Sequence, residues 1–254
     1  MKKFLALIAA LVMTLSCTAA MADDIVYVAT NPEYPPFESV ADDGETIVGY
    51  EVDLLNAIVE KAGFEYQFES MQFASVVSSV QANPNTIGLS GISITPARQM
   101  EVNFSSPYIN AGVAVIVKAD SGIATMDDLN GKVIGAQLGT TSDMKAEEIV
   151  GADNVARYNT FLESVMDLQG NKIDAVFVDR PVGIEILANL NDPSLIMLDI
   201  EIVSDYYGIA VNKNNTELLQ KINDAIAALQ QEGFFDELDM KYFNATGISV
   251  AAAE

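Results

Sequence analysis

The sequence has 254 residues, half of them hydrophobic, and its 36 acidic and 13 basic residues give a formal net charge of −23. Such an acidic chain repels nucleic acid and anionic lipid surfaces, so we expect no nucleic-acid partner. There is no histidine and a single cysteine, Cys17, which excludes Ser-His-Asp catalysis, Cys-His catalysis and metal sites built on histidine.

Residues 1–22 have the three parts of a secretory signal peptide. Lys2 and Lys3 form the positive start, residues 4–15 the apolar middle, and Ala20-Met21-Ala22 an A-x-A cleavage site. We therefore predict an exported protein that is cut near Ala22. The cut lowers the basic count from 13 to 11 and takes the net charge from −23 to −25.

A lipoprotein anchored through Cys17 is the alternative. It fits less well, because the small residues that should precede the cysteine are largely missing from Thr14-Leu15-Ser16. Cleavage at Ala22 removes the cysteine, so the mature chain has no disulfide and no thiolate nucleophile. Histidine and cysteine both being absent, we expect no metal ion and no cofactor.

The mature chain begins with a predicted strand over residues 24–30. Residues 31–37 follow as an irregular loop, because three prolines there are incompatible with a helix or a strand ladder. Tyr34 makes this loop a candidate ligand wall, whereas Phe37 is expected to pack in the core. A turn at residues 42–44 leads to a second short strand over residues 47–50.

Helical spacing predicts a core-facing helix over residues 52–62, ended by Gly63. A strand over residues 64–68 and a second helix over residues 73–81 come next. Phe73 lies in the first turn of that helix, where the preceding strand has just ended. Its ring could therefore face either the core or a cleft.

The stretch from Leu89 to Arg98 is the first candidate site. A buried strand ends near Leu89, and Gly91, Ser93 and Thr95 lead into Pro96, a favoured first residue of a helix. Free backbone N–H groups and the helix dipole at such a junction favour an anion. Arg98 lies one turn into the helix, where its guanidinium could grip a carboxylate at two places, unless it only covers a solvated face.

A second alternation of strands and helices follows a predicted strand over residues 111–117 and a short helix over residues 126–130. It has a strand over residues 133–136, a loop of glycine and hydroxyl residues over residues 138–142, and a helix over residues 143–150. This loop is a second candidate anion site.

Asp179 stands directly after a buried strand predicted over residues 173–178, which follows a helix over residues 161–168. Ligands of open α/β sheets bind beyond the carboxyl ends of the strands, so Asp179 and the two loops are expected to converge. Asp179 could also cap the next helix, with Pro181 just inside it.

The remaining pattern predicts strands over residues 195–198 and 209–211 and helices over residues 218–229 and 234–243. The alternation of strands and helices along the chain favours an α/β fold.

Six motifs together resemble the periplasmic polar amino-acid-binding proteins of ABC importers, solute-binding protein family 3. In chain order they are Tyr34-Pro35-Pro36-Phe37-Glu38, Gly49-Tyr50-Glu51-Val52-Asp53-Leu54-Leu55, Ser90-Gly91-Ile92-Ser93-Ile94-Thr95-Pro96-Ala97-Arg98, Phe104-Ser105-Ser106-Pro107-Tyr108, Leu138-Gly139-Thr140-Thr141-Ser142 and Asp174-Ala175-Val176-Phe177-Val178-Asp179. The resemblance covers essentially the whole mature chain in the right order.

This resemblance implies a two-lobe periplasmic-binding-protein fold of type II, with mixed sheets flanked by helices and a hinge of two strands. Lobe 1 would comprise residues 24–110 and 208–247, and lobe 2 residues 111–207. It also implies a monomer in the periplasm that delivers a free L-amino acid to the membrane permease of an ABC importer.

The resemblance further implies a site that binds both charges of an amino acid. Arg98 would bind the α-carboxylate with the N–H groups of Ser93 and Thr141, and Asp179 the α-ammonium with Ser90 and Ser93. Tyr34 and Phe73 would hold the ligand side chain between them. The full set of expected ligand-binding residues is Asn31, Tyr34, Phe73, Ser90, Gly91, Ser93, Arg98, Gln137, Thr141 and Asp179.

Several residues bear on the ligand. Asn31 stands where family members that bind basic amino acids often have aspartate, although nearby Glu38 could restore that preference. Gln137 could offer its amide to a polar side chain, and Arg180 adds a cation beside Asp179. We expect a polar amino acid, glutamine first and a basic amino acid second.

Two other functions remain open. Some proteins of this fold are enzymes, such as cyclohexadienyl dehydratases, which would need a general acid of raised pKa in the cleft and no ammonium partner. A sensory module that presents its ligand to a receptor is the other. The paired Arg98 and Asp179 favour a binding protein without enzymatic activity.

Overall fold

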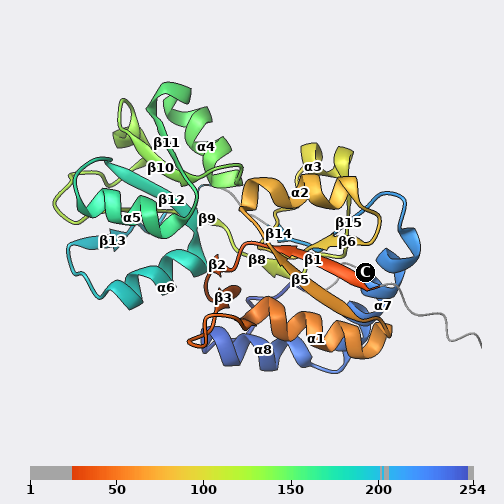
Figure 1. Ribbon diagram of the computed structural model, residues 1–254. Helices are drawn as coiled ribbons and strands as arrows, with labels where there is room; N and C mark the ends of the chain where they lie inside the picture. Colours follow the sequence, from red (N-terminus) through yellow and green to blue (C-terminus); the bar gives the residue numbers. More distant parts are fainter. Residues whose placement is uncertain (1–24, 201, 203–205, 251–254) are drawn as a thin grey trace, which may run out of the picture.

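The computed structural model describes residues 25–200, 202 and 206–250, so the predicted signal peptide and Asp24 lie outside the described residues. Two lobes lie side by side, each built on its own five-stranded sheet (Figure 1). Among the described helices, none combines the length and the apolar character needed to cross a membrane.

The first sheet draws its strands from two distant parts of the chain. Across the sheet they are β5 (Tyr66–Ser70), β1 (Val26–Thr30), β6 (Thr86–Gly88), β15 (Ala210–Val211) and β7 (Asn103–Phe104). β1 runs parallel to β5 and β6, whereas β15 is antiparallel to β6 and β7. The sheet is therefore mixed, as expected for this fold.

Helices cover both faces of the first sheet. They are α1 (Tyr50–Ala62), α2 (Phe73–Ala82), α3 (Pro96–Glu101), α7 (Thr216–Gln231) and α8 (Phe234–Phe243). α1 and α8 lie on one side of the sheet and α2 and α3 on the other (Figure 1). The apolar face predicted for residues 218–229 is buried at Leu218, Ile222, Ile226 and Leu229, and α1 ends at Gly63 in the left-handed conformation.

The second sheet comes from one continuous segment. Its strands, in order, are β11 (Val155–Tyr158), β10 (Ile134–Gln137), β12 (Ala175–Asp179), β9 (Val113–Lys118) and β13 (Leu195–Met197). Its helices are α4 (Thr141–Val150), α5 (Phe161–Gln169), α6 (Arg180–Leu190), and the 3₁₀ helices η1 (Met126–Leu129) and η2 (Ala152–Asn154). β10, β11 and β12 are parallel, and their carboxyl ends carry Gln137, Tyr158 and Asp179.

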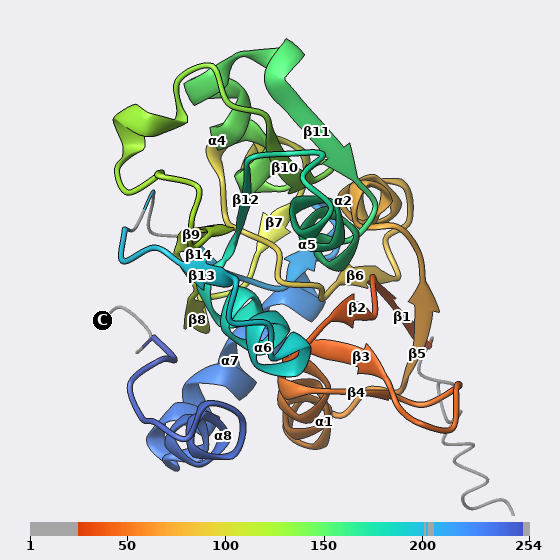
Figure 2. The ribbon, with the colours of Figure 1, turned by 90° about the vertical axis from the view of Figure 1, so that its left-hand side faces the viewer.

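The lobes are joined by two short antiparallel strands, β8 (Ile109–Asn110) and β14 (Tyr206–Tyr207) (Figure 2). Ser249 near the end of the described chain forms a bridge with Ile109. The two lobes and the two-stranded hinge agree with the predicted fold class. The lobe boundaries at residues 110/111 and 207/208 stay a prediction.

The proline-rich loop departs from its prediction. Glu33 and Tyr34 form a short strand, β2, that pairs with β3 (Glu38–Val40), and β3 pairs in turn with β4 (Ile47–Val48). The expectation that residues 31–37 exclude a ladder was wrong, because Pro32, Pro35 and Pro36 flank the paired residues. This small sheet lies beside α1 (Figure 2).

Candidate functional site

The ten expected ligand-binding residues are all buried, and they come from both lobes. The first lobe supplies Asn31 after β1, Tyr34 in β2, Phe73 at the start of α2, Ser90, Gly91 and Ser93 after β6, and Arg98 in α3. The second lobe supplies Gln137 at the end of β10, Thr141 at the start of α4 and Asp179 at the end of β12. Contacts between these groups cross from one lobe to the other.

Arg98 is positioned by the short helix α3. Thr95 caps this helix, since its side-chain oxygen accepts from the Arg98 N–H at 3.2 Å, and Pro96 occupies the first turn. Arg98 is 8% exposed, and its guanidinium donates to the Ser93 carbonyl and, in the other lobe, to the Gly139 carbonyl, each at 2.9 Å. Its central carbon lies 5.5 Å from the centre of the Phe73 ring.

The structure therefore places Phe73 against the guanidinium of Arg98. That contact is a cation–π interaction, which fixes the plane of the guanidinium while leaving its N–H groups directed around its edge. The expected contact of Phe73 with a ligand side chain stays a prediction.

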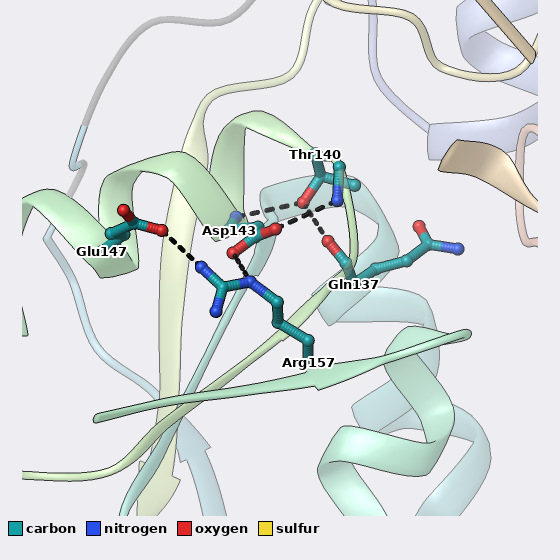
Figure 3. A network of polar contacts seen from close by, with 6 residues as sticks. Gln137, Thr140, Asp143, Glu147 and Arg157 are labelled. Atoms are coloured by element: carbon teal, nitrogen blue, oxygen red, sulfur yellow. Dashed lines mark hydrogen bonds and ion pairs between the residues drawn. The ribbon is translucent and has the colours of Figure 1, made fainter. Parts of the chain in front are cut away.

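The glycine and hydroxyl loop of the second lobe is held by a polar network (Figure 3). Thr140 caps α4, accepting from the Asp143 N–H at 3.1 Å and donating to the Gln137 carbonyl at 2.7 Å. Asp143 accepts from the Gly139 N–H at 3.1 Å and pairs with the Arg157 Nε at 2.8 Å. These bonds fix the start of α4 two residues before the predicted position.

The start of α4 faces the first lobe. Ser93 Oγ and Thr141 Oγ1 lie 3.4 Å apart across the interface. Ser93 also binds Arg98 through its carbonyl oxygen. Thr141 follows closely after Gly139, whose carbonyl oxygen binds the same guanidinium. The two loops predicted as anion sites are thus brought together around one guanidinium.

Asp179 is the buried anion of the interface, at 3% exposure. Its carboxylate accepts hydrogen bonds from the hydroxyls of Tyr34 and Tyr207, and from Ser142 Oγ at 3.3 Å. Asp179 holds the capping position of α6, yet its side chain makes no capping hydrogen bond. The side chain of Asp179 is therefore not the cap of α6, and its role toward a ligand stays a prediction.

An amide contact links the lobes at a third place. Gln137 Nε2 donates to Asn31 Oδ1 at 2.9 Å and to the Asn159 carbonyl at 2.7 Å. Asn31 in turn donates its backbone N–H to Ser90 Oγ at 3.0 Å. Arg180, expected beside the ammonium position, donates to the Ile200 carbonyl at 3.1 Å.

Sequence reasoning missed Tyr207 and Ser142. Tyr207 is fully buried in the hinge strand β14, and its hydroxyl lies 2.7 Å from that of Tyr34. A signal for Ser142 was present, because it directly follows Thr141 in the quoted loop motif. For Tyr207 the signal was its place beside the predicted crossing between the lobes.

A cavity of about 420 Å³ opens between the lobes next to Asn31. Its lining includes Asn31, Glu33 and Gln72 from the first lobe and Asn159, Thr160 and Glu163 from the second. Glu33 and Glu163 make this region acidic, and its lining contains no lysine or arginine among the described residues. A cationic group would be attracted here.

Taken together, the interface offers one buried cation and one buried anion, each fixed by hydrogen bonds and each carried by a different lobe. A small zwitterion carries the two complementary charges, and its carboxylate and ammonium would each form a charge-assisted hydrogen bond with one of them. The surrounding hydroxyl, amide and carbonyl groups would also orient its ammonium and carboxylate.

A family model and individual relatives both match this chain over nearly all of its length after the predicted signal peptide. The model of the family described as bacterial extracellular solute-binding proteins, family 3, matches residues 26–245. ABC transporter arginine-binding protein 1 of Escherichia coli (strain K12) is 32% identical over 248 residues, which cover 96% of this chain and 99% of the relative.

Solved structures of amino-acid-binding proteins are similar to this chain in fold. The arginine-, lysine-, histidine-binding protein ArtJ from Geobacillus stearothermophilus has a TM-score of 0.83 at 32% identity, covering 88% of this chain and 96% of that one. An ancestral arginine-binding protein bound to glutamine has a TM-score of 0.81 at 32% identity, covering 87% and 98% of the two chains. These structures share the two-lobe fold.

Proposed function

Because the chain belongs to the bacterial extracellular solute-binding proteins of family 3, we propose that it captures a free polar L-amino acid between its lobes and delivers it to the permease of an ABC importer. The observation that carries this proposal is the pair of buried charges, Arg98 from the first lobe and Asp179 from the second. Its family and the compared proteins are binding proteins, and the proposal includes no enzymatic step.

The ligand α-carboxylate binds Arg98 in this proposal, together with the N–H groups of Ser93 and Thr141. Support comes from the position of Thr141 at the start of α4, where the helix dipole favours an anion. Gly139 and Ser93 hold the guanidinium through their carbonyl oxygens. The ligand therefore meets a cation that is already oriented.

The ligand α-ammonium binds Asp179, the Ser90 carbonyl and the Ser93 hydroxyl. The hydroxyls of Tyr34, Tyr207 and Ser142 keep the carboxylate in place. An ammonium group is a stronger partner than these hydroxyls, since it adds a positive charge to the hydrogen bond with the carboxylate. Because the two ends of the ligand bind different lobes, its binding energy favours the closed arrangement over an open one.

Arginine and glutamine are the two ligands best supported. The carboxylates of Glu33 and Glu163 at the cavity favour a cationic side chain, and so do the arginine-binding relatives. The neutral pair of Asn31 and Gln137 favours an amide side chain, as does the ancestral protein bound to glutamine. Glutamine was the first choice from the sequence and a basic amino acid the second.

The proposal is tested by a thermal-shift screen of residues 23–254 against the twenty amino acids. A ligand that binds only the folded state adds RT ln(1 + [L]/Kd), so a micromolar binder at millimolar concentration adds about 4 kcal/mol of stability. We expect a strong shift with arginine or glutamine and none with acidic amino acids. Absence of any shift would contradict the proposal and direct the search to dehydratase substrates, with product formation as the measurement.

Two substitutions of Tyr34 separate the contribution of its ring to ligand binding from that of its hydroxyl. Its ring stacks on Phe37 at 5.6 Å and lies 5.7 Å from Phe161, while its hydroxyl binds Asp179. We expect Tyr34→Ala to weaken amino acids with long side chains more than glycine or alanine. Tyr34→Phe keeps the ring and removes the hydroxyl, so it should weaken all ligands by a similar factor.

Calorimetric titration with a long and a short amino acid measures both variants. Equal losses for both ligands in Tyr34→Ala would show that the ring does not contact the ligand side chain.

A further inference from the structure

Two glutamates lie together in the first lobe, behind the loop that contains Ser90 and Gly91. Glu38 begins β3 and Glu51 lies in the first turn of α1, and each is 1% exposed. Their carboxyl groups accept from the consecutive residues Ser90 and Gly91, and each carboxyl affects the pKa of the other. Burial raises the pKa of Glu38 well above its usual range, and the nearby Glu51 charge raises it further. Burial likewise raises the pKa of Glu51.

Hydrogen bonds distinguish the two groups. Glu51 accepts from the Gly91 N–H, at 2.9 Å to Oε1 and 3.2 Å to Oε2, and from the hydroxyl of Tyr108. Glu38 Oε1 accepts from Ser90 Oγ at 2.8 Å. Glu38 Oε2 is buried without a donor among the described residues. Glu51 is therefore the better stabilised as an ionised carboxylate. Glu38 Oε2, which accepts no hydrogen bond from the described residues, is the better place for a bound proton.

Among the described residues, the groups that shift the pKa values of Glu38 and Glu51 are carboxyl, hydroxyl and backbone N–H groups. The titratable groups that face the pair are Tyr108, which precedes β8, and Tyr50 at the start of α1, and burial raises the pKa of both hydroxyls. Among the described residues, no lysine or arginine contributes to the pKa of Glu38 or Glu51. Two adjacent buried carboxyls without a cation cannot both be ionised, as in the aspartic-protease pair.

We propose that Glu38 and Glu51 share one proton, carried on Glu38 Oε2, and that this pair positions the Ser90–Gly91 edge of the ligand site. The positioning role rests on the proposed function. Glu38 orients Ser90 Oγ, which also accepts the Asn31 N–H at 3.0 Å.

Glu51 fixes Gly91, whose backbone is left-handed (φ +55°) and packs closely on the Tyr34 ring. A Cβ at this position would lie 2.4 Å from the ring. A displacement of the Ser90–Gly91 edge would therefore move both the Ser90 carbonyl and the Tyr34 ring.

The shared proton is tested by the pH dependence of urea unfolding, without any ligand. A carboxyl with a raised pKa holds its proton in the folded state above the ordinary value of 4.5, so its contribution to stability is present at low pH and declines as pH rises. Glu38→Gln keeps a donor and an acceptor but has no proton to lose.

We expect the wild-type midpoint to fall more than the Glu38→Gln midpoint between pH 5 and pH 8. Glu69→Gln, at an exposed site in β5, should follow the wild type. Parallel curves for the wild type and Glu38→Gln would overturn the shared proton.

The positioning role is tested by calorimetric titration with the amino acid identified in the screen. Glu38→Gln should keep the Kd within about threefold of the wild type, whereas Glu38→Ala should raise it about tenfold, because Ser90 loses its acceptor. An unchanged Kd in a folded Glu38→Ala would overturn this role. Ser90→Ala breaks the same contact from the ligand side and should show a similar loss if Glu38→Ala does not fold.

Discussion

Replacing Arg98 with alanine is expected to abolish most ligand binding without unfolding the protein. The α-carboxylate would be left in a buried site without its cation, and loss of one partner from a buried charged pair costs about 3–5 kcal/mol. This corresponds to a Kd raised by about 150-fold to several thousandfold. Binding is measured by calorimetric titration and stability by urea unfolding.

Arg180→Ala is the matched control. Arg180 follows Asp179 in the chain, and its guanidinium donates to the Ile200 carbonyl. We expect this variant to bind with nearly wild-type affinity, which would show that the loss in Arg98→Ala is specific to its position. Near-normal binding in Arg98→Ala would remove the central assignment of the site.

Replacing Asp179 with asparagine tests the opposite end of the ligand. The amide is isosteric and its oxygen can still accept from Tyr34, Tyr207 or Ser142, so the fold should be retained. The ligand ammonium would lose its counter-charge, at a cost of about 2–5 kcal/mol. Calorimetric titration should then give a Kd at least thirtyfold above the wild type.

Asp153→Asn, at an exposed position in η2, is the matched control and should bind normally. If Asp179→Asn also bound normally, the carboxylate would serve only as an acceptor for the hydroxyls that surround it. The two charge variants together thus test each end of the ligand separately.

The sequence predicted best the elements whose signals are local. α1 is ended by Gly63 as expected, and α8 covers residues 234–243 as predicted. A glycine marks the end of α1, and a cluster of aromatic residues marks α8. β11 was missed, since Val155–Tyr158 forms a partly exposed edge strand without a continuous apolar run. The strand predicted over residues 64–68 begins two residues later, at Tyr66.

The site residues likewise divide into those that a local sequence pattern marks and those that it does not. Arg98, Thr141 and Asp179 stand at junctions between strands and helices, which a sequence pattern marks. What the pattern could not predict is pairing between distant residues. The hydroxyl of Tyr207 binds Asp179 from the hinge, and the Gly139 carbonyl accepts from Arg98 in the other lobe. Such contacts depend on how the two lobes meet.

The position of β15 between β6 and β7 has a consequence for the order of folding. Residues 113–197 supply every strand of the second sheet, so that lobe can form from one continuous segment. The first sheet stays divided until residues 210–211 arrive to pair with strands formed more than a hundred residues earlier. Contacts that close such long loops form late, because they pay a larger entropy cost. As the chain is completed from its N-terminus to its C-terminus, the lobe that begins first is therefore the lobe that is completed last.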